Sequence, residues 1–446
     1  MDYISCSMGS IIAGEIGVFG YRPSVLMDML AGKRVEVGTK IGAYMRTFSG
    51  DCSPSDLETA LQLVYQLFTT SLTPGEEDVT IVMQMAEEEV RARERDPYTA
   101  FADRVKELNY GKSYFFRPIR INDLPSVDPI KACEYFNQCF KDPSTFTVVI
   151  VGNLDPDITL PLILQYLGGI PKPPGPVLHF NWDDIKGLPF SYPTGIIREV
   201  VWSPMVEAQC LVKLSFPVLL KNGKMAEEIH SVGFLSKLLE TKILQVLRFK
   251  HGQIYSASVS VFLGGNKPSR TGDIRGDMGI NFSCDPGISS KLVDLALNEI
   301  LRLQEDGPSD EDILTILELE QRAHENGLQE NYHWLERILW SYQSRIYDGD
   351  VGTTFEIQDK GRTKLRQSLT PSSAQLELQR ILPYPCSKQY TAVILMPKIS
   401  CFQLLKSFFR SRRNNYARDA KIIASIAGLT VVALSFWRYS RSTLRS

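Results

Sequence analysis

The chain of 446 residues repeats part of its sequence at a fixed spacing of 234 residues. FSGD at 48–51 returns as FSCD at 282–285, and PGEEDV at 74–79 returns as PSDEDI at 308–313. The amphipathic stretches between them, LETALQLVYQLF and KLVDLALNEILRL, fall in the same register. One tetrapeptide match can arise by chance, but several matches in one register indicate duplication. The chain must therefore fold into two similar units.

Each copy shows the same order of sequence patterns. An alternating strand, GAYMRTFSGD or DMGINFSCD, leads through a turn into a helix of 3.6-residue periodicity. A longer helix then begins at a proline followed by acids, which favour the positive end of the helix dipole. An apolar strand, TVVIVG or AVILM, closes the copy. The patterns predict an α+β fold of two homologous two-layer domains, each a mostly antiparallel sheet with helices on one face.

The domain boundaries follow from composition. Prolines and glycines mark a linker between the copies, and basic residues mark a second linker after them. The predicted parts are a domain at 1–170, a linker at 171–193, a domain at 194–398, a basic linker at 399–421 and an apolar segment at 422–437. Net charge over the whole chain is −2, which predicts no nucleic-acid partner.

The last segment resembles a membrane anchor in composition. Residues 422–437, IIASIAGLTVVALSFW, carry no charge and lie between Lys421 and Arg438. A helix of this length spans roughly 24 Å, which is short for a hydrocarbon core of about 30 Å unless the flanking basic residues snorkel. We expect a C-terminal transmembrane helix, with the body in the cytosol at a membrane such as the mitochondrial or plastid outer membrane. A buried helix of a soluble domain is the alternative.

Motifs for catalysis are incomplete. The eight cysteines form no C-x-x-C pair, which favours reduced thiols, and a cysteine nucleophile stays open as an alternative. HENGL at 324–328 comes nearest to a zinc-peptidase motif, but Leu328 stands where the second histidine is needed. No H-x-x-E-H, G-x-S-x-G or Walker sequence occurs in the chain. Motif inspection therefore predicts no catalytic residues and no metal site.

The stretch LRFKHGQIYSASVS at 247–260 combines a charged helix end with the start of a strand. Arg248 falls at the end of a predicted helix, and Tyr255 opens an alternating strand seven residues later. His251 and Gly252 lie in the turn between them. Taken alone, the pair is more often an ordinary corner between a helix and a strand than a binding site.

This stretch and the duplicated body resemble the pitrilysin/insulinase family of zinc metallopeptidases, of the PqqL-like type. The resemblance covers about 1–398 and is to the C-terminal half, the third and fourth domains, with the first of these truncated at its N-terminus. VVIVGNLDPDITLPLILQYLGGIP and SPMVEAQCLVKLSFP carry the rest of the match. The resemblance implies that Arg248 and Tyr255 bind the peptide substrate.

The resemblance also implies what this sequence lacks. The H-x-x-E-H zinc motif belongs to the family's first domain, so zinc is expected only in a missing N-terminal half. We therefore expect a peptide-binding C-terminal half that is inactive without an N-terminal catalytic half, present upstream or supplied in trans. A non-catalytic scaffold or core subunit of a membrane complex is the alternative.

Overall fold

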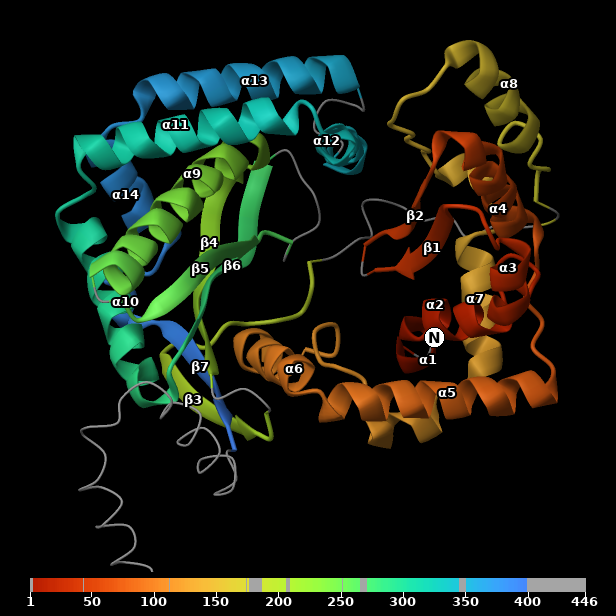
Figure 1. Cartoon of the computed structure of the whole chain (residues 1–446), viewed down its shortest axis with the longest axis horizontal. Coiled ribbons are helices and arrows are strands. Elements are labelled where there is room, and N and C mark those ends of the chain that lie inside the picture. The colour runs from red at the N-terminus through yellow and green to blue at the C-terminus, as the bar shows by residue number, and fades with distance from the viewer. Residues whose placement is uncertain are drawn as a thin grey trace, which may run out of the picture. The chain divides into compact units, whose positions relative to one another are not determined.

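The computed structural model describes most of the chain before residue 399 (Figure 1). The described residues are 3–42, 44–111, 113–173, 175, 187–205, 209–250, 252–264, 271–344 and 350–398. Most of the predicted linker at 171–193 and all of 399–446 lie outside them.

The first half combines a β-hairpin with helices. Strands β1 (Val35–Ile41) and β2 (Arg46–Cys52) pair antiparallel, with Val35 opposite Cys52. The helices are α1 (Tyr3–Ser7), α2 (Gly9–Ile16), α3 (Pro23–Met29), α4 (Leu57–Thr69), α5 (Glu76–Arg95), α6 (Pro97–Tyr110), α7 (Pro129–Cys139) and α8 (Pro156–Tyr166). Their apolar faces meet in a core that includes Ile12, Leu67 and Phe136.

Local sequence sets the starts of these helices. Helices α6, α7 and α8 each begin with an Asp-Pro pair, in which the aspartate caps the helix and proline takes the first position. Asp96, for example, accepts a hydrogen bond from the backbone N–H of Thr99 at 2.7 Å. Helix α5 begins at the acidic signature that follows Pro74, as predicted.

The second half is built on a five-stranded sheet. Its strands are β3 (Ile196–Ser203), β4 (Cys210–Lys224), β5 (Ile254–Phe262), β6 (Thr271–Cys284) and β7 (Tyr390–Pro397), in the order β3-β7-β4-β6-β5. Strand β4 pairs antiparallel with β6 and β7, and β6 pairs antiparallel with β5. The helices are α9 (Met225–Leu244), α10 (Ser289–Glu305), α11 (Asp310–Gly327), α12 (Asn331–Ser344), α13 (Val351–Ser368) and α14 (Pro371–Ile381).

One face of this sheet forms the larger core. Alternate residues of β4, among them Leu214 and Phe216, are completely buried under α9, α10 and α14. Helices α11 and α13 pack on the outside of α9, which adds a second helical layer to the predicted two-layer arrangement (Figure 1). Each such side chain contributes about 1.5–3 kcal/mol through burial. The opposite face, by contrast, carries polar side chains such as Lys213 and Asn281 on β4 and β6, beside the apolar Val393 on β7.

The first half departs from the predicted sheet. TVVIVG at 147–152 was expected to close that sheet, but these residues form no strand in the structure. A strand needs a hydrogen-bonded neighbour, and the apolar pattern alone does not supply one. The counterpart in the second copy does form a strand, β7, because it pairs with β4. The α+β class is correct, with a hairpin in one half and a full sheet in the other.

The predicted C-terminal transmembrane helix needs correction. Within the residues that the structure describes, no helix is both long enough and apolar enough to cross a membrane. The segment 422–437 lies outside those residues. The predicted transmembrane helix is therefore not supported, and the described residues form an α+β fold.

Candidate functional site

Arg248 lies in a rare type of helical turn. Helix α9 continues into a π-helical turn, η5 (Gln245–Lys250), in which Leu247 is completely buried and Arg248 is exposed. The guanidinium carbon of Arg248 lies 5.2 Å from the ring centroid of Phe249, whose side chain is 72% exposed. Single π-helical turns occur frequently at functional sites.

A tight turn leads from η5 to strand β5. Gly252 has φ of +63°, a left-handed conformation that favours glycine. Its N–H donates to the Arg248 carbonyl at 2.7 Å, and the Gln253 N–H donates to the Leu247 carbonyl at 3.1 Å. The side-chain Oε1 of Gln253 is buried and accepts no hydrogen bond from any described residue. The turn thus holds the start of β5 against the end of η5.

Tyr255 lies at an irregularity in β5. Ile254 is opposite Cys284 of β6, but the register then shifts so that Ala257 is opposite Phe282. The chain between them, Tyr255 and Ser256, therefore contains one residue more than the facing strand. A bulge of this kind bends a strand and redirects its side chains. The structure places the backbones of Arg248 and Tyr255 at the two ends of one corner, and it does not describe the Tyr255 side chain.

The sheet face beside this corner is polar. Cross-strand neighbours that share it are Lys213, Asn281 and Ser258 in one row and Ser215, Gly279 and Ser260 in the next. Both β5 serines are exposed. These residues alternate with the buried core positions, so they point away from α9. We call this surface the polar face. Sequence analysis missed it, although the single lysine in the apolar run CLVKLSF was a signal.

Helix α6 closes one end of the polar face. The hydroxyl of Tyr110, the last residue of α6, donates to the buried carboxylate of Asp277 in β6. Beside it, the Thr391 hydroxyl donates to Asn109 Oδ1 at 2.5 Å. Burial raises the pKa of Asp277 above its ordinary value. Ser258 and Ser260 lie beyond this contact and are exposed, Lys213 and Asn281 are partly exposed, and Ser215 is buried.

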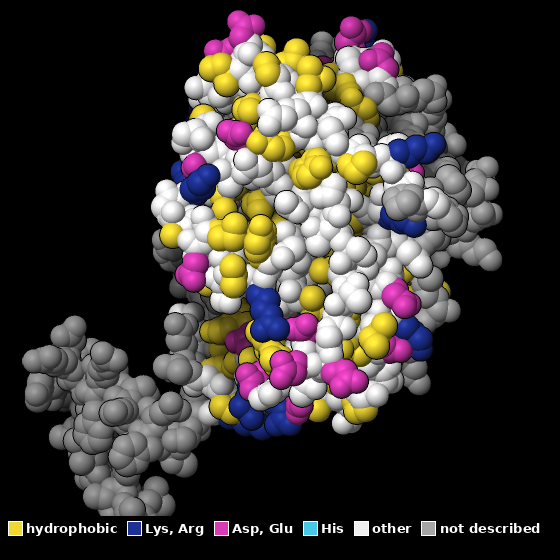
Figure 2. All heavy atoms as spheres, turned by 90° about the vertical axis from the view of Figure 1, so that its right-hand side faces the viewer, with side chains coloured by type: hydrophobic (Ala, Val, Ile, Leu, Met, Phe, Trp, Pro, Cys, Tyr) yellow, Lys and Arg dark blue, Asp and Glu magenta, His cyan; other side chains and the backbone are white. Residues whose placement is uncertain are grey.

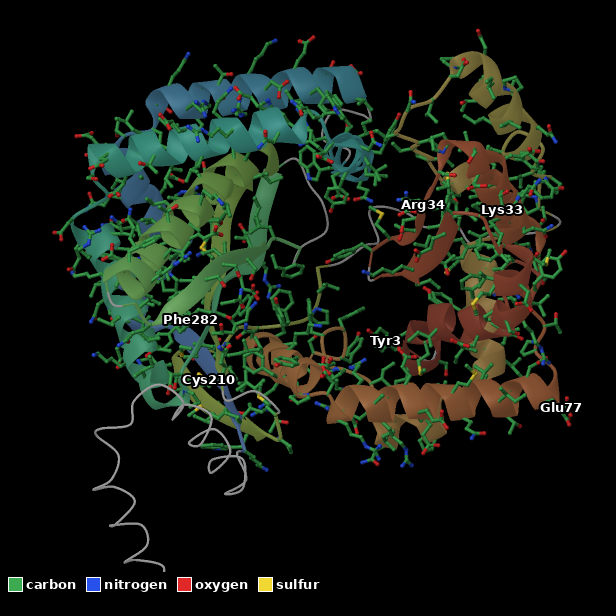
Figure 3. All side chains as sticks on the ribbon, viewed as in Figure 1. Tyr3, Lys33, Arg34, Glu77, Cys210 and Phe282 are labelled. Carbon is green, nitrogen blue, oxygen red and sulfur yellow. The ribbon has the colours of Figure 1, made fainter. Side chains whose placement is uncertain are left out.

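Several of the described cysteines are poorly placed to act as nucleophiles. Burial raises the pKa of the Cys133 and Cys386 thiols to about 11, which disfavours the thiolate that attacks substrates. Cys210, labelled in Figure 3, faces Cys284 on the paired strand with the two sulfur atoms 3.3 Å apart, and both are buried. Cys401 lies outside the described residues.

Candidate metal ligands are scattered. The described residues contain no group of three or more His, Cys, Asp or Glu side chains that could hold a metal ion. The rings of His324 and His333 lie 6.0 Å apart. HWLER at 333–337 has the histidine and glutamate of an H-x-x-E-H motif, but Arg337 replaces the second histidine. Arg337 is already paired with Asp359 at 2.9 Å.

Comparison with known sequences points to one family. Residues 128–319 match the Peptidase M16 inactive domain. The chain is 70% identical over 441 residues to a zinc protease PQQL-like protein of Arabidopsis thaliana. The aligned residues make up 99% of this chain and 44% of that protein. The chain therefore spans less than half the length of this curated relative.

Solved structures show the same fold at low sequence identity. The periplasmic protease PqqL of Escherichia coli has a TM-score of 0.60 at 19% identity, over 89% of this chain and 41% of that chain. The structure of the first half of PqqL alone has a TM-score of 0.64 at 11% identity, over 94% of this chain and 90% of that chain. The fold therefore does not distinguish the halves of such a protein. Residues 128–319 are thus an inactive domain of the M16 peptidase type, and the chain as a whole closely matches part of a PqqL-like zinc protease.

Proposed function

We propose that this chain is the peptide-binding C-terminal half of an M16 zinc metalloendopeptidase. It binds a peptide through Arg248 and Tyr255, and it takes part in hydrolysis only with an N-terminal catalytic half that carries H-x-x-E-H. The observation that carries the proposal is the corner itself. Arg248 lies in a π-helical turn and Tyr255 at a β-bulge of the edge strand β5, and both fall inside the segment that matches the inactive domain.

Each residue has chemistry suited to this role. The Arg248 guanidinium presents several N–H donors, which can bind a peptide carbonyl or a carboxylate. A tyrosine hydroxyl directed at the scissile carbonyl would stabilise the oxyanion that forms there. The zinc ion of the catalytic half would supply the activated water. The present chain would therefore bind and orient the peptide without cleaving it.

Binding of a fluorescein-labelled peptide, followed by anisotropy, tests the first part of the proposal. We expect Arg248→Ala and Tyr255→Phe each to weaken binding about tenfold, which corresponds to ~1.4 kcal/mol. Lys250→Ala is the matched control because Lys250 is an exposed cation in the same turn, and it should bind like the wild type. Equal affinities for all four proteins would refute the binding role.

A second experiment tests the division into halves. The purified chain should show no chelator-sensitive hydrolysis, and a separately expressed N-terminal half with H-x-x-E-H should restore it. Arg248→Ala should then lower the restored rate. Chelator-sensitive cleavage by the isolated chain would contradict the proposal. A scaffold subunit, the alternative function, would assemble equally well with Arg248→Ala and would show no peptide affinity.

A further inference from the structure

Lys213 crosses the middle of the sheet to reach another strand. It belongs to β4, yet its Nζ donates to Ser260 Oγ on β5 at 3.2 Å. Between these strands lies β6, where Gly279 faces the lysine stem. A Cβ atom on Gly279 would lie 2.7 Å from Lys213 Cε and 3.0 Å from Nζ, so any other residue would displace the side chain. A glycine inside a strand often marks such a close approach.

The ammonium group of Lys213 has N–H donors that its contact with Ser260 does not use. Among the described residues Lys213 forms no ion pair, and its contact with Ser260 uses one of its three N–H groups. Two charged groups face it from neighbouring elements. Asp277 of β6 is hydrogen-bonded to Tyr110, and Lys106 of α6 adds a second positive charge. Burial lowers the pKa of Lys213, so the charge lies where water screens it poorly.

The hydrogen bonds around Ser260 keep Lys213 a donor. The Ser260 hydroxyl has one proton, which it donates to the Gly279 carbonyl at 3.3 Å. Its oxygen accepts from Lys213 and from Asn281 Nδ2 at 3.4 Å. A serine nucleophile would instead donate its proton to a neutral lysine. This arrangement therefore fits a fixed cation better than a Ser–Lys catalytic pair.

We propose that Lys213, held by Ser260 over Gly279, binds a carboxylate of the peptide. This inference rests on the proposed peptide-binding function and specifies its substrate class: a peptide with an acidic side chain or a free C-terminus at this position. Tyr255 and Ser260 are five residues apart on β5, roughly 17 Å in an extended strand. An extended peptide along β5 would reach Lys213 about five residues from the position next to Tyr255.

Pairs of matched peptides show which carboxylate Lys213 recognises. Short fluorescein-labelled peptides that differ only by Glu or Gln at one scanned position test a side-chain carboxylate. Peptides that end in a free acid or an amide test the C-terminus. We expect the wild type to bind one acidic form about tenfold more tightly than its neutral partner. Lys213→Met, which keeps the length of the stem without the charge, should abolish that preference and leave binding of the neutral peptide unchanged.

Two further variants complete the experiment. Gly279→Ala keeps the charge but displaces it, so it should also reduce the preference; thermal unfolding checks that it folds. Lys364→Met removes an exposed charge on α13 and should leave the preference intact. If the wild type binds all peptides without preference, or if Lys213→Met keeps the preference, this inference fails and the proposed function stands. If the wild type binds no peptide in either form, the proposed function fails as well.

Discussion

The two copies share their helix caps and differ in their sheets. In the first, Asp78 of α5 accepts a hydrogen bond from the Gly75 N–H at 3.2 Å. In the second, Asp312 of α11 accepts one from the Ser309 N–H at 3.0 Å. Ser309 and Asp312 lie one repeat spacing, 234 residues, after Gly75 and Asp78. Strand β2 of the first copy pairs only with β1 in the described structure, whereas β6 has neighbours on both sides. Duplication thus kept the signals that start helices, while the polar face and the α9–β5 corner belong to the second copy.

Both copies expose apolar side chains on helices, and in the second copy these include Leu314 of α11 and Leu376 of α14. Side chains of α3 and α8, among them Met27, Ile158 and Leu164, are more than 60% exposed. Figure 2 shows hydrophobic side chains gathered in patches on the side of the molecule where these helices lie. In the second copy the residues that distinguish the sheet surface are serines, an asparagine and a lysine. The two copies therefore differ in the kind of surface that they offer as well as in their number of strands.

The largest expected effect compares equivalent phenylalanines. Phe282 and Phe48 occupy the same position in the repeat. Phe282, labelled in Figure 3, is 4% exposed within the large core. Phe48 is only partly buried, against Phe68 and Phe146. Phe282→Ala should lower the free energy of unfolding by about 3–5 kcal/mol, as for a buried phenylalanine. Phe48→Ala should cost clearly less. Urea unfolding followed by circular dichroism measures both, and an equal or larger loss for Phe48→Ala would overturn the difference between the cores.

A second comparison uses the shared caps. Asp312 is also paired with Lys242 at 3.0 Å, and both side chains are largely buried. Asp78 is paired with Arg22 in a more exposed position. Asp312→Ala should cost about 1.5–3 kcal/mol, because hydrogen bonds to a buried charge are lost. Asp78→Ala should cost about 0.5–1 kcal/mol, the usual value for an exposed pair and cap.

The pH dependence of stability gives a further test of the contribution of Asp312. Burial opposes ionisation of Asp312, but its hydrogen bonds from Ser309 and Lys242 outweigh burial and lower its pKa. A lowered pKa in the folded state means that the contribution of Asp312 is complete above its unfolded pKa of about 3.9. The contribution disappears as pH falls through the folded value. The stability difference between wild type and Asp312→Asn should therefore shrink below about pH 4, and a constant difference down to pH 2 would contradict the assignment.

Sequence reasoning succeeded where the signal is local. The proline and acidic residues at 74–78 and 308–312 predict the starts of α5 and α11, because capping involves residues close in sequence. Arg248 and Tyr255 were correctly assigned to a helix end and a strand start for the same reason. Whether they bind peptide stays a prediction.

Reasoning failed where the answer depends on distant partners. The apolar pattern of 147–152 predicts a strand, but a strand forms only where another strand pairs with it. The position of Lys213 over Gly279 requires the register of three strands, which no single stretch encodes. The π-helical turn and the β-bulge likewise result from fitting α9 and β5 to the same sheet. The spatial arrangement of most of the candidate site could therefore not be predicted from the sequence, although Arg248 and Tyr255 could be named from it.

The smallest expected effect concerns the corner, which has no counterpart among the described residues of the first copy. Gly252→Ala places a side chain in a left-handed turn and should lower stability by about 1 kcal/mol. The control, Gly233→Ala, lies on the exposed side of α9 with open space around it and should raise stability by about 0.5–1 kcal/mol. Peptide affinity should fall in Gly252→Ala alone, because the turn fixes the separation of Arg248 from Tyr255. If affinity survives this change, the geometry of the corner does not determine binding, and the polar face around Lys213 becomes the main contact for the peptide.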